Sequence, residues 1–418
     1  MGLTFGVACA SRGAEVFIFD NNVRVIRELK KGNFGLIDSG LDGFLSVISK
    51  TRNVHFVEEN DFGDSFDLVV IAIGTGLEDK VQGNDFFKRF EKTLLKIRNK
   101  DFHLMLRSTV AIGTTSTIFS YIKTKYPQVT ISFCPERSIE GNAINDCLEL
   151  PQIVSGVNDN SLAFALKFFE SISINTIVST NPSEAELCKL ICNVWRDSTF
   201  AIANEFSQIA SHHEIDIFNA IEVSNRDYGR SSIPIPGPVA GPCLTKDSSI
   251  LTRGLFDTSE QTKKLLVNVA RSINSSLSKK IVKFIRDNFD SVNCHILILG
   301  SAFKGHPPTK DTRNSFGVEL YDNFKRDFEV SIIDPEIDGL TCEVDDSKII
   351  NLLNGSDVII LTTNHNYFNN KDFFDMLDKI ENKGKYLIDL WPKSRKWYAN
   401  QLQIKCIRFS DWHTINDE

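Results

Sequence analysis

The sequence lacks the features that mark a membrane protein or a nucleic-acid-binding protein. Among its 418 residues, no apolar run approaches the length needed to span a bilayer. The N-terminus has no charged stretch followed by an apolar core and a cleavage site, so we predict no secretion signal. The formal net charge is −7, whereas binding to a phosphate backbone needs a basic face. We therefore expect a cytoplasmic protein without a membrane or a nucleic acid as partner, although a local basic pocket for a diphosphate is compatible with this charge.

Paired cysteines and metal-binding spacings are also missing. The nine cysteines are scattered, and an odd number without paired spacing favours reduced thiols and a cytoplasmic setting. The eight histidines form no HExxH pattern and no zinc-finger spacing, so we expect no metal. Most cysteines are small buried side chains. We predict this for Cys9, Cys188, Cys192 and Cys294.

Two α/β regions around a helical middle make up the rest of the chain. Apolar strands alternate with amphipathic helices at both ends, whereas residues 183–224 and 259–289 have helical apolar spacing. Strands and helices that alternate across short loops predict parallel sheets covered by helices on both faces. The predicted fold class is therefore α/β, with two Rossmann-like domains at 1–180 and 291–418 and a long-helix domain at 181–290 between them.

The chain opens on the second half of a dinucleotide-binding motif. A complete motif has a strand, the pattern GxGxxG and a helix whose N-terminus faces the pyrophosphate. Gly2 matches the last glycine, and Asp20 ends the strand "EVFIFD", where an acid binds the ribose hydroxyls. The first strand, which is central in the predicted sheet, is predicted to be missing together with two glycines. Two explanations stay open: translation starts upstream of Met1, or the chain starts here and binds NAD weakly or not at all.

The stretch "GPCLTKDSSIL" points most directly to chemistry. Cys243 follows a loop rich in glycine and proline that we predict over residues 230–247, and Lys246 and Asp247 follow the cysteine. A thiolate is a good nucleophile when a nearby cation stabilises it. Added to an aldehyde, it would form a thiohemiacetal, hydride loss would give a thioester, and water would release an acid.

Motifs along almost the whole chain resemble those of the UDP-glucose/GDP-mannose dehydrogenases, the nucleotide-sugar 6-dehydrogenases. "AGPCLTKDSSIL" resembles GGxCLxKDxxxL, with Ala240 in place of a glycine. "LKKGNFGLIDSGLDGFL" is similar to a segment that ends in EPGL, here residues 38–41, and "IAIGTG" is similar to VGTP, with Gly76 in place of the proline. The other similar segments are "GLTFGVACASRGAEVFIFD", "RSTVAIGTT", "CPERSIEGNA", "SEAELCKLICNVWRD" and "GSAFKGHPPTKDTRNS".

The resemblance implies a catalytic set around the cysteine. Cys243 would be the covalent nucleophile. Lys189 and Asn193, four apart and so on one face of a helix, would hold the sugar C6 oxygen and stabilise its negative charge. Asp247 would transfer protons with water or Lys189. Glu140 would help water attack the thioester, and Thr109 would order that water.

Around Lys189, the pattern predicts further local structure. Ser183 and Glu186 have the spacing of a capping box at the start of the long helix. Leu190 and Ile191 next to Lys189 are expected to be buried, which argues against a solvated Lys189.

The resemblance also implies NAD as cofactor and a UDP-sugar as substrate. The implied cofactor-binding residues are Gly2, Asp20, Gly74, Thr75, Thr109, Lys246 and Arg313. The implied substrate-binding residues are Glu136, Lys189, Asn193, Arg230, Gly237, Phe303 and Lys304. Arg230 would reach the substrate of a second subunit in a homodimer built on the middle helices. The segment before Arg313 is two residues longer than the family pattern, which weakens the match at that arginine.

The implied reaction is the four-electron oxidation of the C6 hydroxyl of a UDP-hexose to the UDP-uronic acid, a precursor of surface polysaccharides. It uses two NAD and one water. "PER" favours an N-acetylated sugar such as UDP-N-acetylmannosamine, whereas "PCLTKD" and Glu140 fit UDP-glucose. Two rivals remain: a non-catalytic nucleotide-sugar-binding paralogue, and a single-step β-hydroxyacid dehydrogenase, against which Cys243 argues.

Overall fold

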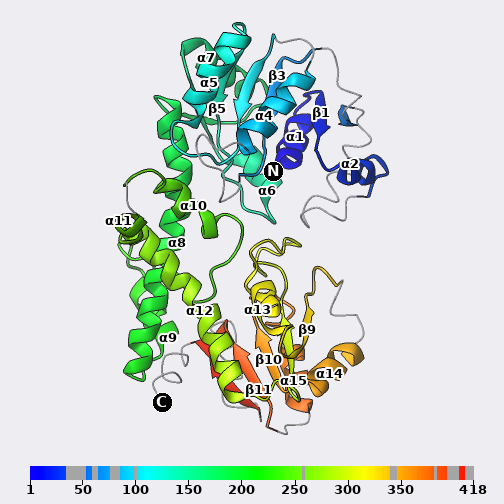
Figure 1. Cartoon of the computed structure of the whole chain (residues 1–418), viewed down its shortest axis with the longest axis vertical. Helices are drawn as coiled ribbons and strands as arrows, with labels where there is room; N and C mark the ends of the chain where they lie inside the picture. Colours follow the sequence, from blue (N-terminus) through cyan, green and yellow to red (C-terminus); the bar gives the residue numbers. More distant parts are fainter. Residues whose placement is uncertain are drawn as a thin grey trace. The chain divides into compact units, whose positions relative to one another are not determined.

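The structure, a computed structural model, describes residues 1–33, 53–58, 65–75, 85–97, 101–256, 259–338, 346–380, 384–392 and 404–409. The segment that resembles EPGL, residues 38–41, and Gly76 lie outside these residues. The chain divides into two compact units: Met1–Cys192 with Ser249–Leu255, and Asn193–Ser248 with Phe256–Glu418. Figure 1 traces both units by colour along the sequence. The three-part division read from the sequence stays a prediction.

The first unit is an α/β body. Its elements in order are α1 (Gly2–Ser11), β1 (Val16–Phe19), α2 (Val23–Lys30), β2 (Val54–Val57), β3 (Leu68–Ile71), α4 (Asp85–Lys96), β4 (His103–Leu106), α5 (Thr114–Lys125), β5 (Thr130–Phe133), α6 (Ala143–Glu149), β6 (Gln152–Gly156), α7 (Asp159–Ser171) and β7 (Thr176–Val178). The predicted strand EVFIFD and the alternation of strands with helices that the sequence indicated are therefore present. Gly32, just after α2, has φ +79°, a conformation that suits glycine at the end of a helix.

A five-stranded sheet in the order β3-β4-β5-β6-β7 forms the centre of this unit. All its pairs are parallel except β5 with β6. Side chains alternate across a strand, so Leu104 and Leu106 of β4 pack with α4 and α5, whereas Met105 packs with α1 and α7. Helices therefore cover both faces, as a parallel sheet requires.

The parallel strands β1 and β2 form a separate two-stranded sheet. Helix α1 is the first element of the chain, and its small residues let it pack closely on strands of both sheets. A Cβ added at Gly6 would lie 3.1 Å from Val16, and one added at Gly2 would lie 3.3 Å from Ala72 at the end of β3. Among the residues that the structure describes, no strand pairs with both β1 and β3, so the strands fall into two sheets.

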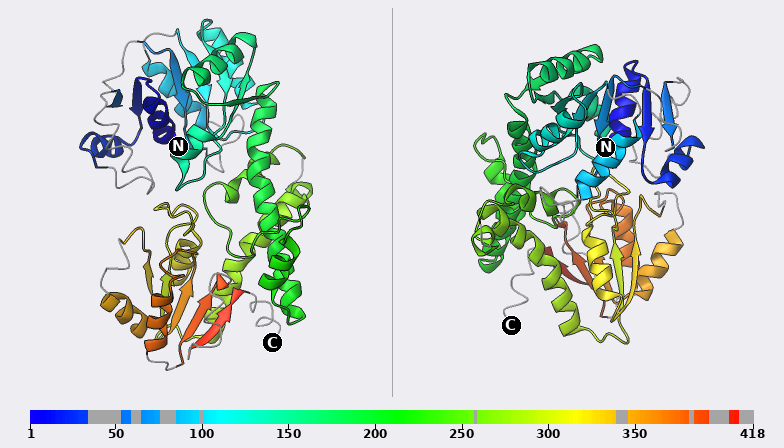
Figure 2. Two further views of the ribbon diagram at one scale, coloured as in Figure 1. Left: turned by 180° about the vertical axis from the view of Figure 1, so that it is seen from behind. Right: turned by 45° about the horizontal axis from the view of Figure 1, so that its top comes forward.

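The second unit combines long helices with a second sheet (Figure 2). Its elements are α8 (Pro182–His212), whose first turns belong to the first unit, α9 (Ile217–Asn225), α10 (Leu244–Leu251), which also crosses the division, α11 (Ser259–Lys263), α12 (Leu266–Asn288), β8 (His295–Leu299), α13 (Phe316–Phe324), β9 (Glu329–Ile333), α14 (Asp346–Gly355), β10 (Val358–Leu361), α15 (Lys371–Lys379), β11 (Tyr386–Asp389) and β12 (Lys405–Arg408). No described helix has both the length and the apolar character needed to cross a membrane.

The second sheet is fully parallel, in the order β12-β11-β10-β8-β9. Ile296 and Ile298 of β8 pack with α12 and α13 on one face, and Leu297 and Leu299 pack with α14 and α15 on the other. This is the doubly wound arrangement in which the strand order reverses between β8 and β10. Ligands of such folds bind outside the carboxyl ends of the strands at that point.

Three local predictions about the helices were wrong. Residues 244–247 are the start of α10 rather than loop, because the carbonyl of Cys243 already accepts hydrogen bonds from the amides of Lys246 and Asp247. The second helical stretch is two helices, α11 and α12. The capping box at Ser183 is absent: the Asn181 side chain accepts from the amide of Glu184, and Glu186 binds elsewhere.

Candidate active site

In the first unit, predicted cofactor residues lie at the carboxyl ends of parallel strands. Asp20 directly follows β1, and its exposed carboxylate accepts a hydrogen bond from the amide of Asn22 at 2.7 Å. Gly74 and Thr75 follow β3, and Thr109 follows β4. The Thr75 hydroxyl donates to the carbonyl of Thr109 at 2.7 Å, which ties the two loops together.

These residues fit a bound dinucleotide. The first turn of α1 carries no acidic residue, so its backbone N–H groups present a positive end to a phosphate. Gly2 permits the close approach of α1 to β3, and Asp20 supplies a carboxylate for ribose hydroxyls. Arg313 and Lys246, the two other predicted cofactor residues, lie in the second unit.

Glu136 lies after β5 in a buried ion pair with Arg107. Their closest atoms, Arg107 Nη2 and Glu136 Oε2, are 2.5 Å apart, and Gln152 accepts a second bond from Nη2 at 3.0 Å. Burial favours the neutral acid, but the charge and hydrogen bond of Arg107 outweigh it and lower the pKa of Glu136 to about 2. The guanidinium lies 3.9 Å from the ring centroid of Phe5. Glu136 is 3% exposed, so its predicted contact with substrate would require an approach through this packing.

Glu140 lies in the turn between β5 and α6, where it is half-buried. It is separated in sequence from Glu136 by a turn whose backbone is bound to side-chain carboxylates. The amide of Ser138 donates to Glu136, and the amide of Ile139 donates to Asp146. The predicted role of Glu140 in activating water stays a prediction.

Glu186 caps the helix that follows the Thr109 loop. Its carboxylate accepts from the amides of Gly113 at 2.6 Å and Thr115 at 2.7 Å, and from the Thr115 hydroxyl at 2.6 Å. Gly113, the N-cap of α5, has no side chain to satisfy these amides itself. Burial raises the pKa of Glu186 and the three hydrogen bonds oppose that rise. One turn of α8 therefore connects Lys189 to the loop that carries Thr109.

Lys189 and Asn193 lie on the same buried face of α8, as predicted. Lys189 is 8% exposed and Asn193 is 9% exposed. Leu190 is buried, but Ile191 is exposed, contrary to expectation. Cys188 and Cys192 are also exposed, whereas Cys9 and Cys294 are buried as predicted. The buried face of this helix is thus unusually polar.

Cys243 lies at the N-terminus of α10 with an exposed thiol. A helix N-terminus stabilises negative charge, which suits a thiolate. Asp247, in the first turn, is 1% exposed, and its carboxylate accepts from the Asn193 amide at 2.6 Å and from Lys246 Nζ at 3.1 Å. The structure therefore brings Asn193, Asp247 and Lys246 together next to the cysteine in sequence. Lys246 lies against Asp247. The predicted contact of Lys246 with the cofactor stays a prediction.

Phe303 and Lys304 lie in the loop after β8, at the point where the strand order of the second sheet reverses. Lys304 Nζ is 5.6 Å from the ring centroid of Phe303. The ring also contacts the cysteine loop, residues 230–243: a Cβ added at Gly241 would lie 2.7 Å from Phe303 Cδ2, and Gly241 has φ +98°. Only glycine fits there. The loop of Phe303 and Lys304 and the cysteine loop are therefore in direct contact within this unit.

The remaining predicted residues lie along the same two loops. Arg313 is largely exposed and binds the carboxylate of Asp311, with Nε 2.9 Å from Oδ2. Arg230 is exposed at the start of the cysteine loop. Gly237 is buried in that loop, where a Cβ would lie 3.0 Å from Trp391 Cζ3. Their roles toward cofactor and substrate stay predictions.

Four polar residues on the helices beside the cysteine loop, three of them buried and Arg271 half-buried, were not predicted from the sequence. Asp197 and Asn204 of α8 and Arg271 and Asn274 of α12 form one connected network. The signal was available on α8, because Glu186, Lys189, Asn193, Asp197 and Asn204 recur on one face of a helix. Only two of these five were singled out for chemistry.

The residues described above point to one class of protein. They comprise an acid after β1, a helix N-terminus packed on β3, a loop after the first strand of a second parallel sheet, and a thiol at the start of α10. This combination is typical of a Rossmann-type dehydrogenase, with the cysteine as candidate nucleophile. Profiles of the UDP-glucose/GDP-mannose dehydrogenase family match the NAD binding domain over residues 1–172, the central domain over 183–276 and the UDP binding domain over 297–394. The chain belongs to this family. It is thus an oxidoreductase with NAD as cofactor.

Two kinds of relative illustrate the similarity. The chain is 26% identical over 413 residues to the UDP-N-acetyl-D-mannosamine dehydrogenase of Methanococcus vannielii, covering 94% of this chain and 93% of that protein. It is 25% identical to the protein of that name from Pyrococcus horikoshii, over 88% of each chain. A solved structure of UDP-D-ManNAc dehydrogenase from Pyrococcus horikoshii has a TM-score of 0.82 at 22% identity, covering 99% of this chain and 97% of that one, and shows the shared fold.

Proposed function

We propose that the protein oxidises the C6 hydroxyl of a UDP-N-acetylhexosamine, such as UDP-N-acetylmannosamine, to the UDP-uronic acid. The observation that carries this proposal is Cys243 at the N-terminus of α10, followed by the buried pair of Asp247 and Asn193. A thiol in that place suits an oxidation that passes through a covalent adduct. A single-step alcohol dehydrogenase needs no such nucleophile.

The chain's residues support each step in turn. The C6 alcohol loses a hydride and a proton and becomes an aldehyde, while Lys189 and Asn193 hold its oxygen. The Cys243 thiolate adds to the aldehyde carbon, and the oxygen takes up a proton to give a thiohemiacetal. Loss of a second hydride and a proton leaves a thioester. Water, oriented by Glu140 and Thr109, then adds to the thioester carbon, releases the thiolate and leaves the carboxylic acid.

NAD supplies the hydride acceptor for both oxidations. On this proposal Asp20 binds its ribose hydroxyls, the first turn of α1 at Gly2 faces its pyrophosphate, and Gly74, Thr75 and Thr109 line the carboxyl ends of β3 and β4. The uridine nucleotide is held by the loop of Phe303 and Lys304. Arg230 and Gly237 of the cysteine loop are the remaining substrate residues.

The choice of an N-acetylated sugar has two supports. "PER" at Pro135–Arg137 resembles the branch that uses such sugars. The similar curated proteins from three Methanococcus species carry the name UDP-N-acetyl-D-mannosamine dehydrogenase. A free thiol stays reduced most readily in a reducing compartment, so a cytoplasmic location forms part of the proposal.

The deciding experiment measures NADH formation with UDP-N-acetylmannosamine, UDP-glucose and UDP-N-acetylglucosamine as substrates. We expect two NADH for each UDP-N-acetylmannosamine, and loss of acid formation in Cys243→Ser. Cys188→Ser, which changes another exposed thiol, is the matched control and should keep full activity.

Each other result has a clear meaning. Preferential turnover of UDP-glucose would correct the sugar and keep the reaction. Acid formation by Cys243→Ser would remove the cysteine from the mechanism. Binding of UDP-sugar in calorimetry without any NADH would support a non-catalytic nucleotide-sugar-binding protein.

We also propose that the protein forms a homodimer through α8. Ile191, Trp195, Ile202, Phe206 and Ile209 are exposed, and their spacing places them on one face of this helix, opposite its buried polar face. Apolar side chains in such a row mark a protein interface. A second copy of the same helix would cover them symmetrically.

A further inference from the structure

Groups outside the loop that presents Cys243 form hydrogen bonds with the peptide groups of the loop and so hold it in place. The side chain of Asn225 binds both groups of Ile233: its Oδ1 accepts from the amide at 2.9 Å and its Nδ2 donates to the carbonyl at 2.8 Å. Asn204 binds Gly237 in the same two-bond manner, at 2.9 Å and 3.2 Å. The amide of Gly241 donates to the carbonyl of Asn314 at 2.9 Å.

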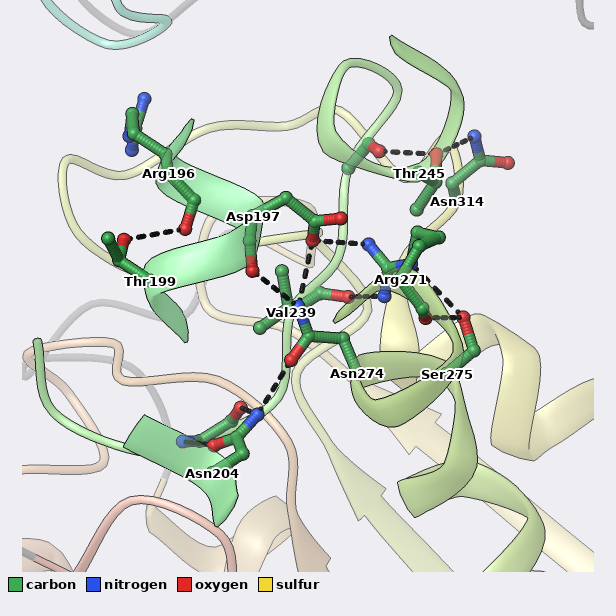
Figure 3. Close-up of polar contacts among 12 residues, drawn as sticks. Arg196, Asp197, Thr199, Asn204, Val239, Thr245, Arg271, Asn274, Ser275 and Asn314 are labelled. Atoms are coloured by element: carbon green, nitrogen blue, oxygen red, sulfur yellow. Dashed lines mark hydrogen bonds and ion pairs between the residues drawn. The ribbon is translucent and has the colours of Figure 1, made fainter. Parts of the chain in front are cut away.

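Asn204 is the point where this loop meets the buried polar network of α8 and α12 (Figure 3). Its Nδ2 donates to Asn274 Oδ1 at 2.9 Å, and Asn274 Nδ2 donates to both the carbonyl and Oδ1 of Asp197 at 2.8 Å. Arg271 binds Asp197 Oδ1 at 2.8 Å and reaches the carbonyl of Val239 at 3.5 Å. Donors and acceptors alternate along this network, so the orientation of the Asn204 amide is set on both sides.

Burial of this polar network costs free energy, so we expect it to serve a purpose other than stability. Asp197 is 1% exposed, and among the described residues its Oδ2 has no hydrogen-bond partner. Burial raises the pKa of Asp197, and Arg271 opposes that rise. A packed apolar set between two helices would often be as stable as such a pair. The geometry of the loop offers a reason, because three of the network's bonds end on its backbone.

The segment from Gly237 to Cys243 is conformationally restricted, so a displacement at one end moves the other end. Pro238 and Pro242 have fixed φ angles. Gly241 is locked by the Phe303 ring, and its carbonyl accepts from the Thr245 hydroxyl at 2.8 Å. Asn314 donates in turn to that hydroxyl at 2.9 Å (Figure 3). A shift of the Gly237 peptide therefore passes along a stiff segment to the cysteine.

We propose that Asn204 is a positioning residue for Cys243: it fixes the Gly237 peptide, and Asn274, Asp197 and Arg271 fix Asn204. The catalytic part of this proposal rests on the proposed function of Cys243. A thiol must meet its target carbon within a narrow range of distance and direction, and a misplacement of about 1 Å can cost about 100-fold in rate.

Asn204→Ala and Asn225→Ala form a matched pair for the kinetic test. Each removes a two-bond clamp on the same loop, but Ile233 lies farther from Cys243 than Gly237 does. We expect Asn204→Ala to lower kcat about 10–100-fold with little change in KM for UDP-sugar. Asn225→Ala should keep kcat close to wild type. Asn274→Ala, which leaves both bonds to Gly237 in place, should fall between them.

Hydrogen exchange of the same variants tests the clamp without any turnover. In Asn204→Ala, the amides of residues 235–241 should exchange faster, whereas in Asn225→Ala the faster amides should be those near Ile233. Alkylation of buried Cys294 reports general unfolding, and it should stay as slow as in wild type.

The outcomes separate the two proposals. Wild-type kcat in Asn204→Ala, or equal losses in both clamp variants, would overturn the positioning role. If Asn204→Ala exposes Cys294, Asn274→Ala decides, and wild-type kcat there would count against the role. No turnover by the wild-type protein with any UDP-sugar would reject the proposed function, whereas exchange confined to residues 235–241 would still support the clamp on the loop.

Discussion

The ion pair of Arg107 and Glu136 shows what a single buried pair contributes in the first unit. Both side chains are almost fully buried, and within the described residues Arg107 Nε and Nη1 have no hydrogen-bond partner. Attraction between the two charges offsets a large loss of hydration. Neither residue is therefore tolerable alone in its charged form.

Replacement of Arg107 by methionine should destabilise the protein strongly. The carboxylate of Glu136 would stay buried without its partner, at a cost of about 3–5 kcal/mol. Urea unfolding followed by circular dichroism measures the change. The double variant Arg107→Met, Glu136→Gln should recover most of the loss, and a double variant as unstable as the single one would contradict this account.

The same pair predicts a pH dependence of stability. The folded pKa of Glu136 is about 2, below its ordinary value of 4.5, so the folded protein binds this proton less readily than the unfolded chain. The stabilisation is complete above pH 4.5 and is lost as the pH falls toward 2. Unfolding midpoints measured across this range should drop less steeply in the double variant than in wild type.

Residue types in the site were predictable from sequence, but their partners were not. The GPCLTKD stretch pointed to Cys243 and Asp247, and helical spacing placed Lys189 beside Asn193. The bonds from Asn193 to Asp247 and from Glu186 to Thr115 join segments far apart in sequence, so local pattern gives no access to them. Glu186 illustrates the error that follows: its spacing from Ser183 suited a capping box, and the tertiary partner prevailed.

At the scale of elements, the start of α5 depends on a side chain from α8. Glu186→Ala should therefore leave the amides of Gly113 and Thr115 unsatisfied in a buried place, and destabilise the protein by about 1–3 kcal/mol. Glu205→Ala, an exposed glutamate on the same helix, is the matched control and should have little effect. Equal unfolding midpoints for the two variants would remove this role from Glu186.

The positions of helices and strands could largely be predicted from the sequence, since the spacing of apolar residues matches the buried positions in most of them. The buried runs HILIL and VIIL form adjacent strands, as their continuous apolar character indicated. The start of α10 was hidden by the prolines and glycines before it. The antiparallel pairing of β5 with β6 depends on how strands meet, which no local pattern encodes.

At the scale of the whole molecule, the exposed row on α8 predicts a dimer. Trp195, near the middle of α8, is 68% exposed. Trp195→Glu should place a charge in the interface and give a monomer in analytical ultracentrifugation, where wild type sediments as a dimer. Val292→Glu, a change at a single apolar residue that is 87% exposed in the turn before β8, should stay dimeric. Monomeric wild-type protein at working concentration would reject the dimer.

The cysteine loop is gripped through amides and carbonyls, which every amino acid possesses. Asn204, Asn225 and Arg271 would therefore hold it equally well with other side chains at Ile233 or Val239, whereas Gly237 and Gly241 are constrained by the rings of Trp391 and Phe303. The position of the nucleophile is thus set largely by residues outside the loop, namely side chains of neighbouring helices that take no part in the proposed reaction. Substitutions in such a loop can therefore change the substrates that it accepts while Cys243 keeps its position.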